Sequence, residues 1–361
     1  MSIFYSYVFL GTFVLAVILT IFVKKLAEKL KIIDLPTGGR KHHTRPVPLL
    51  GGLAIFLTFF IIAYLFRDQL LAGNLEMHHW LGVFVGAVWL MIGGWLDDKY
   101  NLSAKWQLLF PILAALSVVA FGVGVEKITN PLGSGFLYLD AFKFPVLAWG
   151  GVMHYFVLIA DLFAFLWLTG MMYTTKLLDG LDGLVAGVSG VGALIIFLFT
   201  MTTQYFQPDI GLAALILSGA CFGFLVLAWY PGKIFLGEGG SLFLGFMLGV
   251  LSIISGGKIA IALLIMGIPI LDVIWTIVRR ILNKQNPFKT ADRRHLHFKL
   301  LDSGLSNRQT VLIYYALAAV FGLSTLFLQS QGKFVSLVIL GLIMLAMIIG
   351  FNWLDKKSKI A

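Results

Sequence analysis

Long apolar runs separated by short polar segments dominate the chain. An apolar run of about 20 residues is long enough to cross the hydrocarbon core of a bilayer as a helix. About eleven such runs can be placed, and no soluble domain fits between them. The runs lie near residues 2–23, 49–66, 80–97, 106–124, 153–172, 184–203, 210–229, 240–256, 258–280, 311–328 and 334–354. This pattern predicts an all-α polytopic integral membrane protein, with a single transmembrane domain over residues 1–361.

The composition supports this class and excludes others. Of the 361 residues, 59% are hydrophobic and only 12% are charged, whereas an average soluble domain has about 25% charged residues. A soluble globule, a disordered chain and a disulfide scaffold are therefore excluded. The single cysteine, Cys221, can form no internal disulfide. The net charge of +10 is typical of basic membrane loops facing anionic headgroups, so we expect no nucleic-acid partner.

Lys and Arg are concentrated in alternate polar segments. Cytoplasmic loops of membrane proteins carry an excess of these residues. If the N-terminus is outside, 22 of the 27 basic residues face the cytoplasm. These inside segments are residues 24–48, 98–105, 173–183, 230–239, 281–310 and 355–361. We therefore predict an outside N-terminus, a cytoplasmic C-terminus and an odd number of spans.

The longest outside segment, residues 125–152, contains the stretch Phe136–Phe144, in which apolar and polar residues partly alternate. Alternation of this kind is typical of a strand with one buried face. A small β-hairpin is therefore compatible with this segment.

Unusual polar residues gather at the predicted cytoplasmic ends of the spans. Transporters more often place ionisable groups near the bilayer midplane, and Asp161 and Asp272 are the residues here that would suit that alternative. The others come from four separate connections: Asp97 with Asp98, Asp179 with Asp182, Glu238, and His295 with His297. Their location favours a site where a water-soluble molecule meets a lipid-borne one.

Asp97 and Asp98 are adjacent carboxylates at the C-terminal end of a predicted helix. The helix dipole disfavours negative charge there, so a cation is expected beside them. Lys99 and Lys105 are one source of positive charge. Mg²⁺ is the other, because it binds one or two carboxylates and completes its shell with water and substrate phosphates.

Two glycine-rich segments precede predicted helices. Asp179 and Asp182 are spaced i, i+3 and could share one side of the chain, although Asp is also a common helix cap. Residues 235–245 place Glu238 at a helix start, where backbone N–H groups bind anions. An acidic residue there suits a phosphate that arrives with Mg²⁺, and a simple capping role is the alternative.

The segment 291–299 carries Arg293, Arg294, His295 and His297 in the most basic loop. Histidines at i, i+2 do not share a helix face, so they are not a helical zinc pair. Arg beside His suits a diphosphate, and a solvated cytoplasmic loop is the alternative.

Together these motifs resemble the polyprenyl-phosphate N-acetylhexosamine-1-phosphate transferase superfamily over nearly the whole chain. The motifs that carry the resemblance are, in order, 34–36, 40–52, 97–105, 179–184, 235–245, 269–272, 279–280, 292–298 and 304–310. The His-Leu-His-Phe loop and eleven spans are closer to the GlcNAc-1-phosphate transferase branch than to the phospho-MurNAc-pentapeptide translocase branch. The resemblance implies that the inside loops 24–48, 98–105, 173–183, 230–239 and 281–310 form the active site.

The implied reaction transfers an N-acetylhexosamine 1-phosphate from a UDP-sugar, with UDP-GlcNAc expected, to undecaprenyl phosphate, and it releases UMP. This is the first membrane step of a cell-envelope pathway such as lipopolysaccharide or teichoic acid synthesis in a bacterial plasma membrane. The resemblance assigns Asp97 and Glu238 to Mg²⁺, with Mn²⁺ able to substitute, and Asp98 to the lipid phosphate as base or orienting group. The implied substrate-binding residues are Lys41, Lys176, Asp179, Asp182, Phe235, Ser241, Arg293, Arg294, His295 and His297.

Three positions depart from the family pattern. Lys176 and Ala228 stand where the family usually has Asn, and Glu238 stands where it has a metal-binding Asp. The alternatives left open are a phospho-MurNAc-pentapeptide transferase, another UDP-N-acetylsugar donor, a lipid-phosphate transporter and a binder without turnover. A homodimer also stays open.

Overall fold

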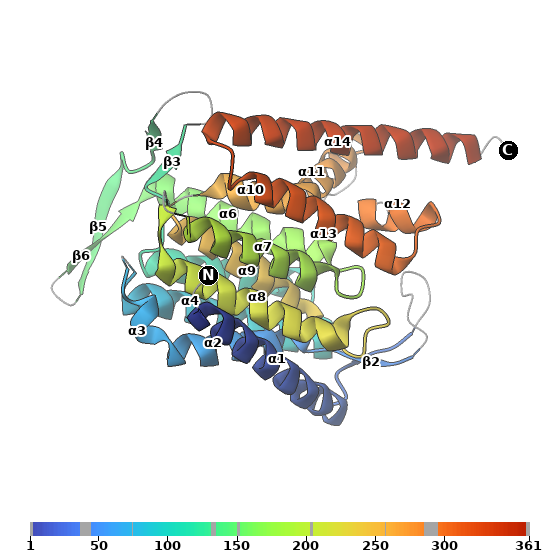
Figure 1. Cartoon of the computed structure of the whole chain (residues 1–361), viewed down its shortest axis with the longest axis horizontal. Coiled ribbons are helices and arrows are strands. Elements are labelled where there is room, and N and C mark those ends of the chain that lie inside the picture. The colour runs from blue at the N-terminus through green and yellow to red at the C-terminus, as the bar shows by residue number, and fades with distance from the viewer. Residues whose placement is uncertain are drawn as a thin grey trace.

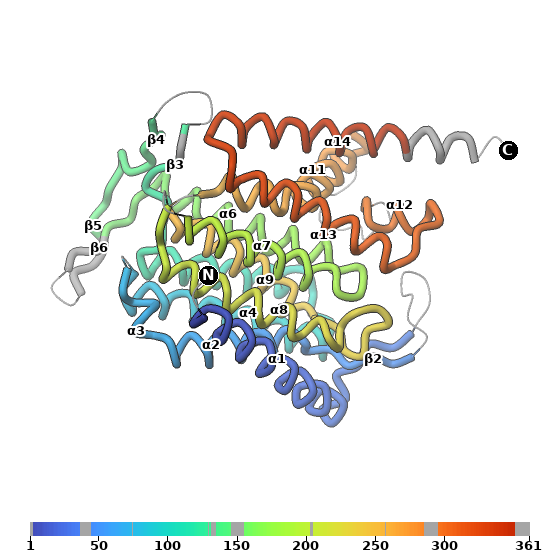
Figure 2. Tube along the Cα trace, in the orientation of Figure 1, coloured from blue at the N-terminus to red at the C-terminus, as the bar shows by residue number. Residues whose placement is uncertain are grey.

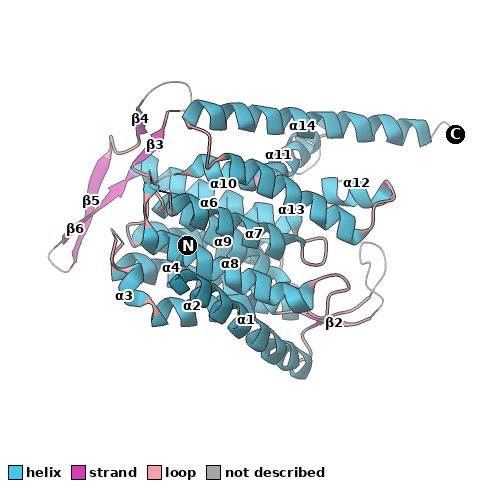
Figure 3. Cartoon of the chain, viewed as in Figure 1, coloured by secondary structure: helices cyan, strands magenta, loops and turns pink. Residues whose placement is uncertain are grey.

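The computed structural model describes residues 3–36, 45–73, 75–130, 135–149, 152–202, 205–256, 258–284 and 295–358. Within these ranges the chain is mostly helical, with three two-stranded sheets (Figures 1 and 3). The helices are α1 (Ile3–Lys29), α2 (Gly51–Leu65), α3 (Arg67–Leu70), α4 (Met77–Tyr100), α5 (Ala104–Ala120), α6 (Leu158–Leu178), α7 (Leu184–Thr200), α8 (Pro208–Ala228), α9 (Gly237–Ile254), α10 (Ile259–Ile265), α11 (Gly267–Leu282), α12 (Leu296–Asp302), α13 (Asn307–Ser324) and α14 (Ser330–Ser358).

Each predicted apolar run coincides with at least one of these helices. Six helices, namely α1, α4, α6, α8, α9 and α14, are long and apolar enough to cross a membrane. Helices α2, α5 and α7 are apolar but shorter. The described part of the chain is thus a multi-pass helical membrane protein.

The run 258–280, predicted as one span, is instead two helices. Helices α10 and α11 meet at an angle of 80°, and together they would count as a seventh span. Pro269 explains why a straight helix cannot continue here, because proline has no N–H to donate to the carbonyl of Ile265. In the first turn of a new helix the same proline is tolerated.

The segment that was predicted to lie outside, together with the start of the next run, forms two hairpins where one was expected. Strand β3 (Lys127–Thr129) pairs with β4 (Phe136–Tyr138), and β5 (Lys143–Trp149) pairs with β6 (Val152–Val157), both antiparallel. The predicted stretch Phe136–Phe144 is therefore divided between β4 and β5. The run that was predicted to begin a span at residue 153 starts as strand β6, and its helix begins at Leu158.

Helices α8 and α9 form the centre of the bundle. Most of their apolar windows, 83% and 89%, are buried, against 28% for α1 and 17% for α14. Figure 2 shows α14 at the edge of the bundle, which is where a lipid-facing helix belongs. The exposed apolar side chains of α1 and α14 are therefore the surface expected in a bilayer.

Glycines allow α2 and α4 to approach the start of α9. A Cβ atom on Gly52 would lie 2.0 Å from the Cα of Gly240, and one on Gly94 would lie 2.1 Å from the amide nitrogen of Gly239. Small residues at such crossings permit the close backbone contact that membrane helices use for packing. These contacts bring the C-terminal end of α4 and the N-terminal end of α9 together.

The two ends of the bundle differ in structure. A short pairing of β1 (Ile33–Asp34) with β2 (Val47–Pro48), and helix α12, lie at one end, and β3 to β6 lie at the other (Figure 1). The start of α1 is at the hairpin end, since Tyr5 packs on Phe197 near the end of α7 with ring centroids 5.4 Å apart. The β1–β2 pairing and the hairpins are thus separated along the helix axes.

Candidate active site

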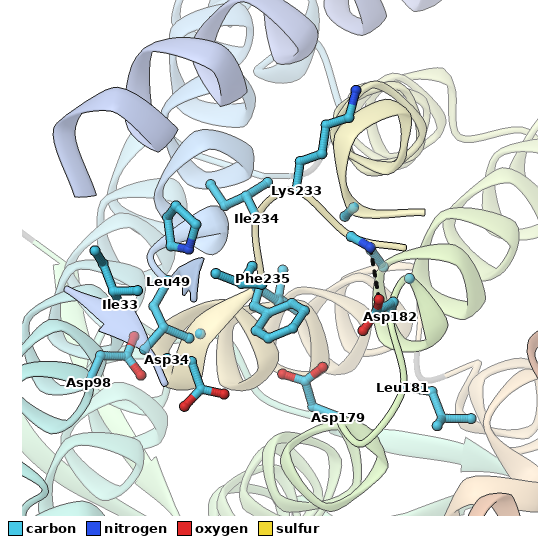
Figure 4. A pocket seen from close by; sticks show the side chains of 18 of the residues that line it. Ile33, Asp34, Leu49, Asp98, Asp179, Leu181, Asp182, Lys233, Ile234 and Phe235 are labelled. Atoms are coloured by element: carbon cyan, nitrogen blue, oxygen red, sulfur yellow. Dashed lines mark hydrogen bonds between the residues drawn. The ribbon is translucent and has the colours of Figure 1, made fainter. Parts of the chain in front are cut away.

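A cavity of about 1250 Å³ opens at the end of the bundle that carries β1 and β2. Figure 4 shows carboxylates from separate segments around it, among them Asp34, Asp98 and Asp179. Seven acidic and three basic side chains line the cavity, so negative charge is in excess. Six predicted site residues are among the lining residues: Asp97, Asp98, Asp179, Asp182, Phe235 and Glu238.

Asp98 joins the end of α4 to the beginning of α9. Its Oδ1 accepts a hydrogen bond of 3.1 Å from the backbone N–H of Glu238. The backbone of Gly237 has a φ of 77°, and a Cβ there would lie 2.5 Å from Asp98 Oδ2. The positive end of the α9 dipole therefore offsets the unfavourable position of this carboxylate at the end of α4.

A chain of polar contacts connects Asp97 with Glu238. Asp97 Oδ1 accepts hydrogen bonds from the backbone N–H of Leu102 at 2.8 Å and from Gln107 Nε2 at 3.0 Å. Gln107 Oε1 in turn accepts from Lys176 Nζ at 3.1 Å. The same ammonium group forms an ion pair with Glu238 Oε1. Lys176 is thus the counter-ion of Glu238. Both residues are among the three that depart from the family pattern.

Sequence reasoning missed Gln107, which connects Asp97 with Lys176, the ion-pair partner of Glu238. The available signal was a polar side chain one turn into the otherwise apolar helix α5. It also missed Asp34, Arg45 and Lys233, which line the cavity. Asp34 and Arg45 lie within motifs of the family pattern, but the sequence alone suggested no role for them.

The loop after α6 is tied to the loop after α8. Asp182 Oδ2 accepts a hydrogen bond of 2.8 Å from the backbone N–H of Gly232, drawn as a dashed line in Figure 4. Asp179 is accessible to water inside the cavity. Burial by the surrounding protein, together with the negative charges of Glu238, Asp98 and Asp182, raises the pKa of Asp179 to about 8. The cluster therefore lacks positive charge.

The donors suit a magnesium ion that arrives with a substrate. Within the described residues, no three Asp, Glu, His or Cys side chains converge as a metal cage. Mg²⁺ is commonly bound by one or two carboxylates together with substrate phosphates. Asp97 and Glu238 both line the cavity, and burial, together with the neighbouring carboxylates Glu238, Asp98 and Asp182, raises the pKa of Asp179. The residues fit Mg²⁺ shared with a phosphate ligand.

His295 lies outside the cavity lining and is paired with Asp272. Its Nδ1 is 2.8 Å from Asp272 Oδ2, and both side chains are buried. Asp272 Oδ1 also accepts a hydrogen bond of 3.0 Å from the backbone N–H of Leu296. The carboxylate of Asp272, in α11, therefore holds the start of α12, which gives it a structural role.

His297 packs beside the Asp179 loop. Its ring is parallel to that of His295, with centroids 5.7 Å apart, and a Cβ on Gly180 would lie 2.5 Å from His297 Nε2. Burial and the neighbouring His295 lower the pKa of His297 to about 3, so its ring is neutral at physiological pH. Phe298, the next residue, lines the cavity.

The remaining predicted residues fall into two groups. Ser241 is buried in the first turn of α9, where its Oγ donates to the carbonyl of Glu238 at 3.0 Å. Asp161 accepts a hydrogen bond of 2.7 Å from the backbone N–H of Val157, which gives this carboxylate a local structural role at the start of α6. Lys41, Arg293 and Arg294 lie outside the described residues.

Comparisons with known proteins identify the family of the chain. Residues 80–256, which contain most of the described cavity carboxylates, match glycosyl transferase family 4. The chain is 32% identical over 345 residues to the probable undecaprenyl-phosphate N-acetylglucosaminyl 1-phosphate transferase of Bacillus subtilis (strain 168), covering 94% of this chain and 89% of the relative.

Two further relatives belong to the two branches named above. The decaprenyl-phosphate N-acetylglucosaminephosphotransferase of Mycobacterium tuberculosis is 30% identical over 322 residues, or 81% of this chain and 74% of the relative. The phospho-N-acetylmuramoyl-pentapeptide-transferase of Prochlorococcus marinus is 28% identical over 281 residues, or 72% of each. Because the Bacillus subtilis relative is matched over most of both chains, the chain belongs to glycosyl transferase family 4 and is a phosphoglycosyl transferase of the polyprenyl-phosphate N-acetylhexosamine-1-phosphate transferase superfamily.

Proposed function

We propose that the protein transfers GlcNAc 1-phosphate from UDP-GlcNAc to undecaprenyl phosphate, yielding UMP and the polyprenyl-diphospho-sugar. The observation that carries this proposal is the position of Asp98. This residue lines both the charged cavity and a second, largely apolar crevice of about 240 Å³. A single carboxylate at the junction of a polar and an apolar space is where a lipid phosphate would meet a soluble nucleotide.

The apolar crevice suits the beginning of a prenyl chain. It lies between α2, α4 and the start of α9, where Trp95 and Ile92 are exposed on the bundle surface. The residues around it are Leu50, Leu53, Met91, Ile92, Trp95, Asp98, Leu236, Gly239 and Gly240. A prenyl phosphate bound here would bury isoprene units in the crevice and place its phosphate near Asp98. Because the second pKa of a phosphate monoester is about 6, Asp98 needs mainly to orient that phosphate for direct attack.

On the donor side, Asp97 and Glu238 would hold Mg²⁺ together with the diphosphate of the UDP-sugar. When bound, Mg²⁺ would neutralise the charge of the diphosphate, and phosphoryl transfer depends mostly on such neutralisation and on positioning. With Mg²⁺ at Glu238, Lys176 would pair with the donor phosphates in place of Glu238. Asp179, Asp182 and Phe235 would contact the nucleotide, with the Phe235 ring available to stack on uracil.

The remaining predicted residues would act around the sugar and the diphosphate. We assign Arg293, Arg294 and Lys41 to the phosphates, and the neutral ring of His297 to a contact near the Asp179 loop. Ser241 and His295 are positioning residues in this scheme, because each is buried against the protein.

We further propose a topology of eleven crossings, with the N-terminus outside and the cavity facing the cytoplasm of a bacterial cell. The supporting observations are the charge asymmetry of the sequence and the position of the cavity at the same end of the bundle as β1, β2 and α12, which belong to the described parts of the two most basic segments. In this topology one domain holds the whole site. A reporter fused after Ala361 should read cytoplasmic, and a periplasmic signal would contradict the topology.

The test of the reaction is UMP release by the purified full-length protein. The protein is incubated with Mg²⁺, undecaprenyl phosphate and, in turn, UDP-GlcNAc, other UDP-N-acetylsugars and UDP-MurNAc-pentapeptide. UMP should appear only when both lipid phosphate and a UDP-sugar are present, and fastest with UDP-GlcNAc. A faster rate with another donor would transfer the assignment to that sugar. Absence of UMP with every donor, together with retained lipid binding, would favour the transporter or binder alternative.

A further inference from the structure

The end of the bundle opposite the cavity carries a pair of lysines beside an aromatic stack. The rings of Phe199, at the end of α7, and Tyr205 are stacked 4.7 Å apart at 18°. Lys258 Nζ lies 5.2 Å and 4.5 Å from these two ring centroids. Lys333 Nζ, from the first turn of α14, lies 4.5 Å and 5.7 Å from them. Three segments distant in sequence thus bring two ammonium groups to the same pair of rings.

The charge of this lysine pair is not balanced by acid. Both lysines are half-buried, and neither forms an ion pair with a carboxylate in the described part of the chain. Lys258 Nζ donates to Gln207 Oε1 at 3.1 Å, which is a neutral partner. Burial and the charge of Lys333 lower the pKa of Lys258 to about 8. Asp209, two residues after Gln207, is buried, with Gly73 beside its carboxylate.

Other lysines at this end are arranged differently. Lys143 Nζ is 3.1 Å from Asp140 Oδ2 and 3.9 Å from Glu126 Oε1. Lys127 lies alone over the ring of Phe136, at 5.1 Å. Lys143 is thus paired with acids, and Lys127 lies over its ring without a second lysine. The two half-buried ammonium groups of Lys258 and Lys333, which share one pair of rings, therefore need a separate explanation. Placing like charges side by side costs free energy unless an anion compensates them.

We propose that Lys258 and Lys333 form a binding site for a phosphate-bearing anion, with the Phe199–Tyr205 stack as its apolar floor. The aromatic rings attract the ammonium groups but accept no strong hydrogen bond from them, so N–H donors remain for phosphate oxygens. A phosphodiester headgroup at the membrane surface and free inorganic phosphate share this chemistry. Helix α7, with 17 residues, separates the site from the cavity by about 25 Å, so it is distinct from the site of transfer.

The test compares lysine variants of the full-length detergent-solubilised protein. Lys258→Met and Lys333→Met keep an unbranched side chain one atom shorter and remove the charge. Lys127→Met is the matched control, since it removes a lysine over a ring at the same end. Each protein is titrated with phosphatidylglycerol, phosphatidylcholine or inorganic phosphate. Thermal unfolding and native mass spectrometry report the bound ligand.

Phosphatidylglycerol should stabilise the wild type and Lys127→Met equally. Each lysine near an anionic surface contributes about fivefold in affinity, so the double variant should bind about 25-fold more weakly. Stabilisation by phosphatidylglycerol alone identifies a lipid headgroup, and equal stabilisation by inorganic phosphate identifies the free anion. Lys258→Arg with Lys333→Arg should restore binding, which separates lost charge from damaged folding. Unchanged lipid binding in the double Met variant, or stabilisation by phosphatidylcholine as strong as by phosphatidylglycerol, would overturn the proposal.

Discussion

The two ends of this bundle hold opposite unbalanced charges and differ in how they do so. At the cavity, carboxylates from four connections are in excess, and the ion pair of Lys176 with Glu238 offsets one of them. At the hairpin end, Lys258 and Lys333 lie together without a described acidic partner. Both arrangements call for a ligand of the opposite sign. The cavity adds depth, a relay of polar contacts and an adjoining apolar crevice, which is what distinguishes a site for chemistry from a site for binding alone.

Metal removal should produce the largest difference between the two ends, because it should affect turnover at the cavity but not lipid binding at the lysine pair. EDTA should reduce UMP release to background, and Mg²⁺ or Mn²⁺ should restore it, because carboxylates in excess need a divalent cation to approach a diphosphate. Retention of phosphatidylglycerol at the lysine pair should be unaffected by the same treatment, as native mass spectrometry can verify. Full turnover in EDTA would remove magnesium from the proposed mechanism.

The next largest effect is expected from the residue shared by the cavity and the crevice. Asp98→Asn should lower UMP release by about 100-fold, since the amide can still accept the hydrogen bond from Glu238 but carries no charge. Lys258→Met should stay within about twofold of the wild type, because that residue is outside the transfer site. If Asp98→Asn retained more than a tenth of the activity, Asp98 could not be the group that orients the lipid phosphate.

A smaller change should follow from shortening Glu238. Glu238→Asp withdraws the carboxylate from Lys176 and should lower activity by about tenfold, with a higher Mg²⁺ concentration for the half-maximal rate. Lys176→Asn combined with Glu238→Asp should cost less than the two single changes together, because contacting residues are energetically coupled. A Glu238→Asp enzyme that is faster and needs less Mg²⁺ would instead mean that Glu238 is an impaired version of the family aspartate.

The smallest effect concerns the pH dependence of stability. The pKa of Asp179 is raised from 3.8 to about 8, so between these values the folded state keeps a proton that the unfolded chain has lost. Stability should therefore fall as pH rises through this window and level off above it. Asp179→Asn removes the dependence and should gain a few degrees in thermal midpoint at pH 9 relative to the wild type, but not at pH 4. Water in the cavity screens part of the effect, and an equal difference at both pH values would contradict it.

Much of the architecture followed from local sequence because the bilayer imposes local rules. Helix length, apolar composition and the side of the basic loops are each read from a contiguous segment. For this reason every predicted run coincides with a helix. Three of the four connections that were predicted to share a site, those of Asp97, Asp179 and Glu238, line one cavity. The sequence did not predict the break between α10 and α11 at Met266, nor that the run at residue 153 begins as strand β6. An apolar run has the same composition whether it forms a straight helix, a bent helix or a strand.

Only the tertiary structure decided which side chains meet. Gln107 and Lys176 are 69 residues apart, and Asp98 caps a helix whose Glu238 is 140 residues away. Asp272 and His295, each considered separately from sequence, turn out to be one buried pair. Lys258 and Lys333 resemble ordinary outer-loop lysines in the sequence, and only the fold places both beside Phe199. The amino-acid sequence determines which groups are costly to bury, but the partner that offsets each cost is set by helix packing, since glycine contacts such as Gly94 with Gly239 determine how closely the helix ends approach.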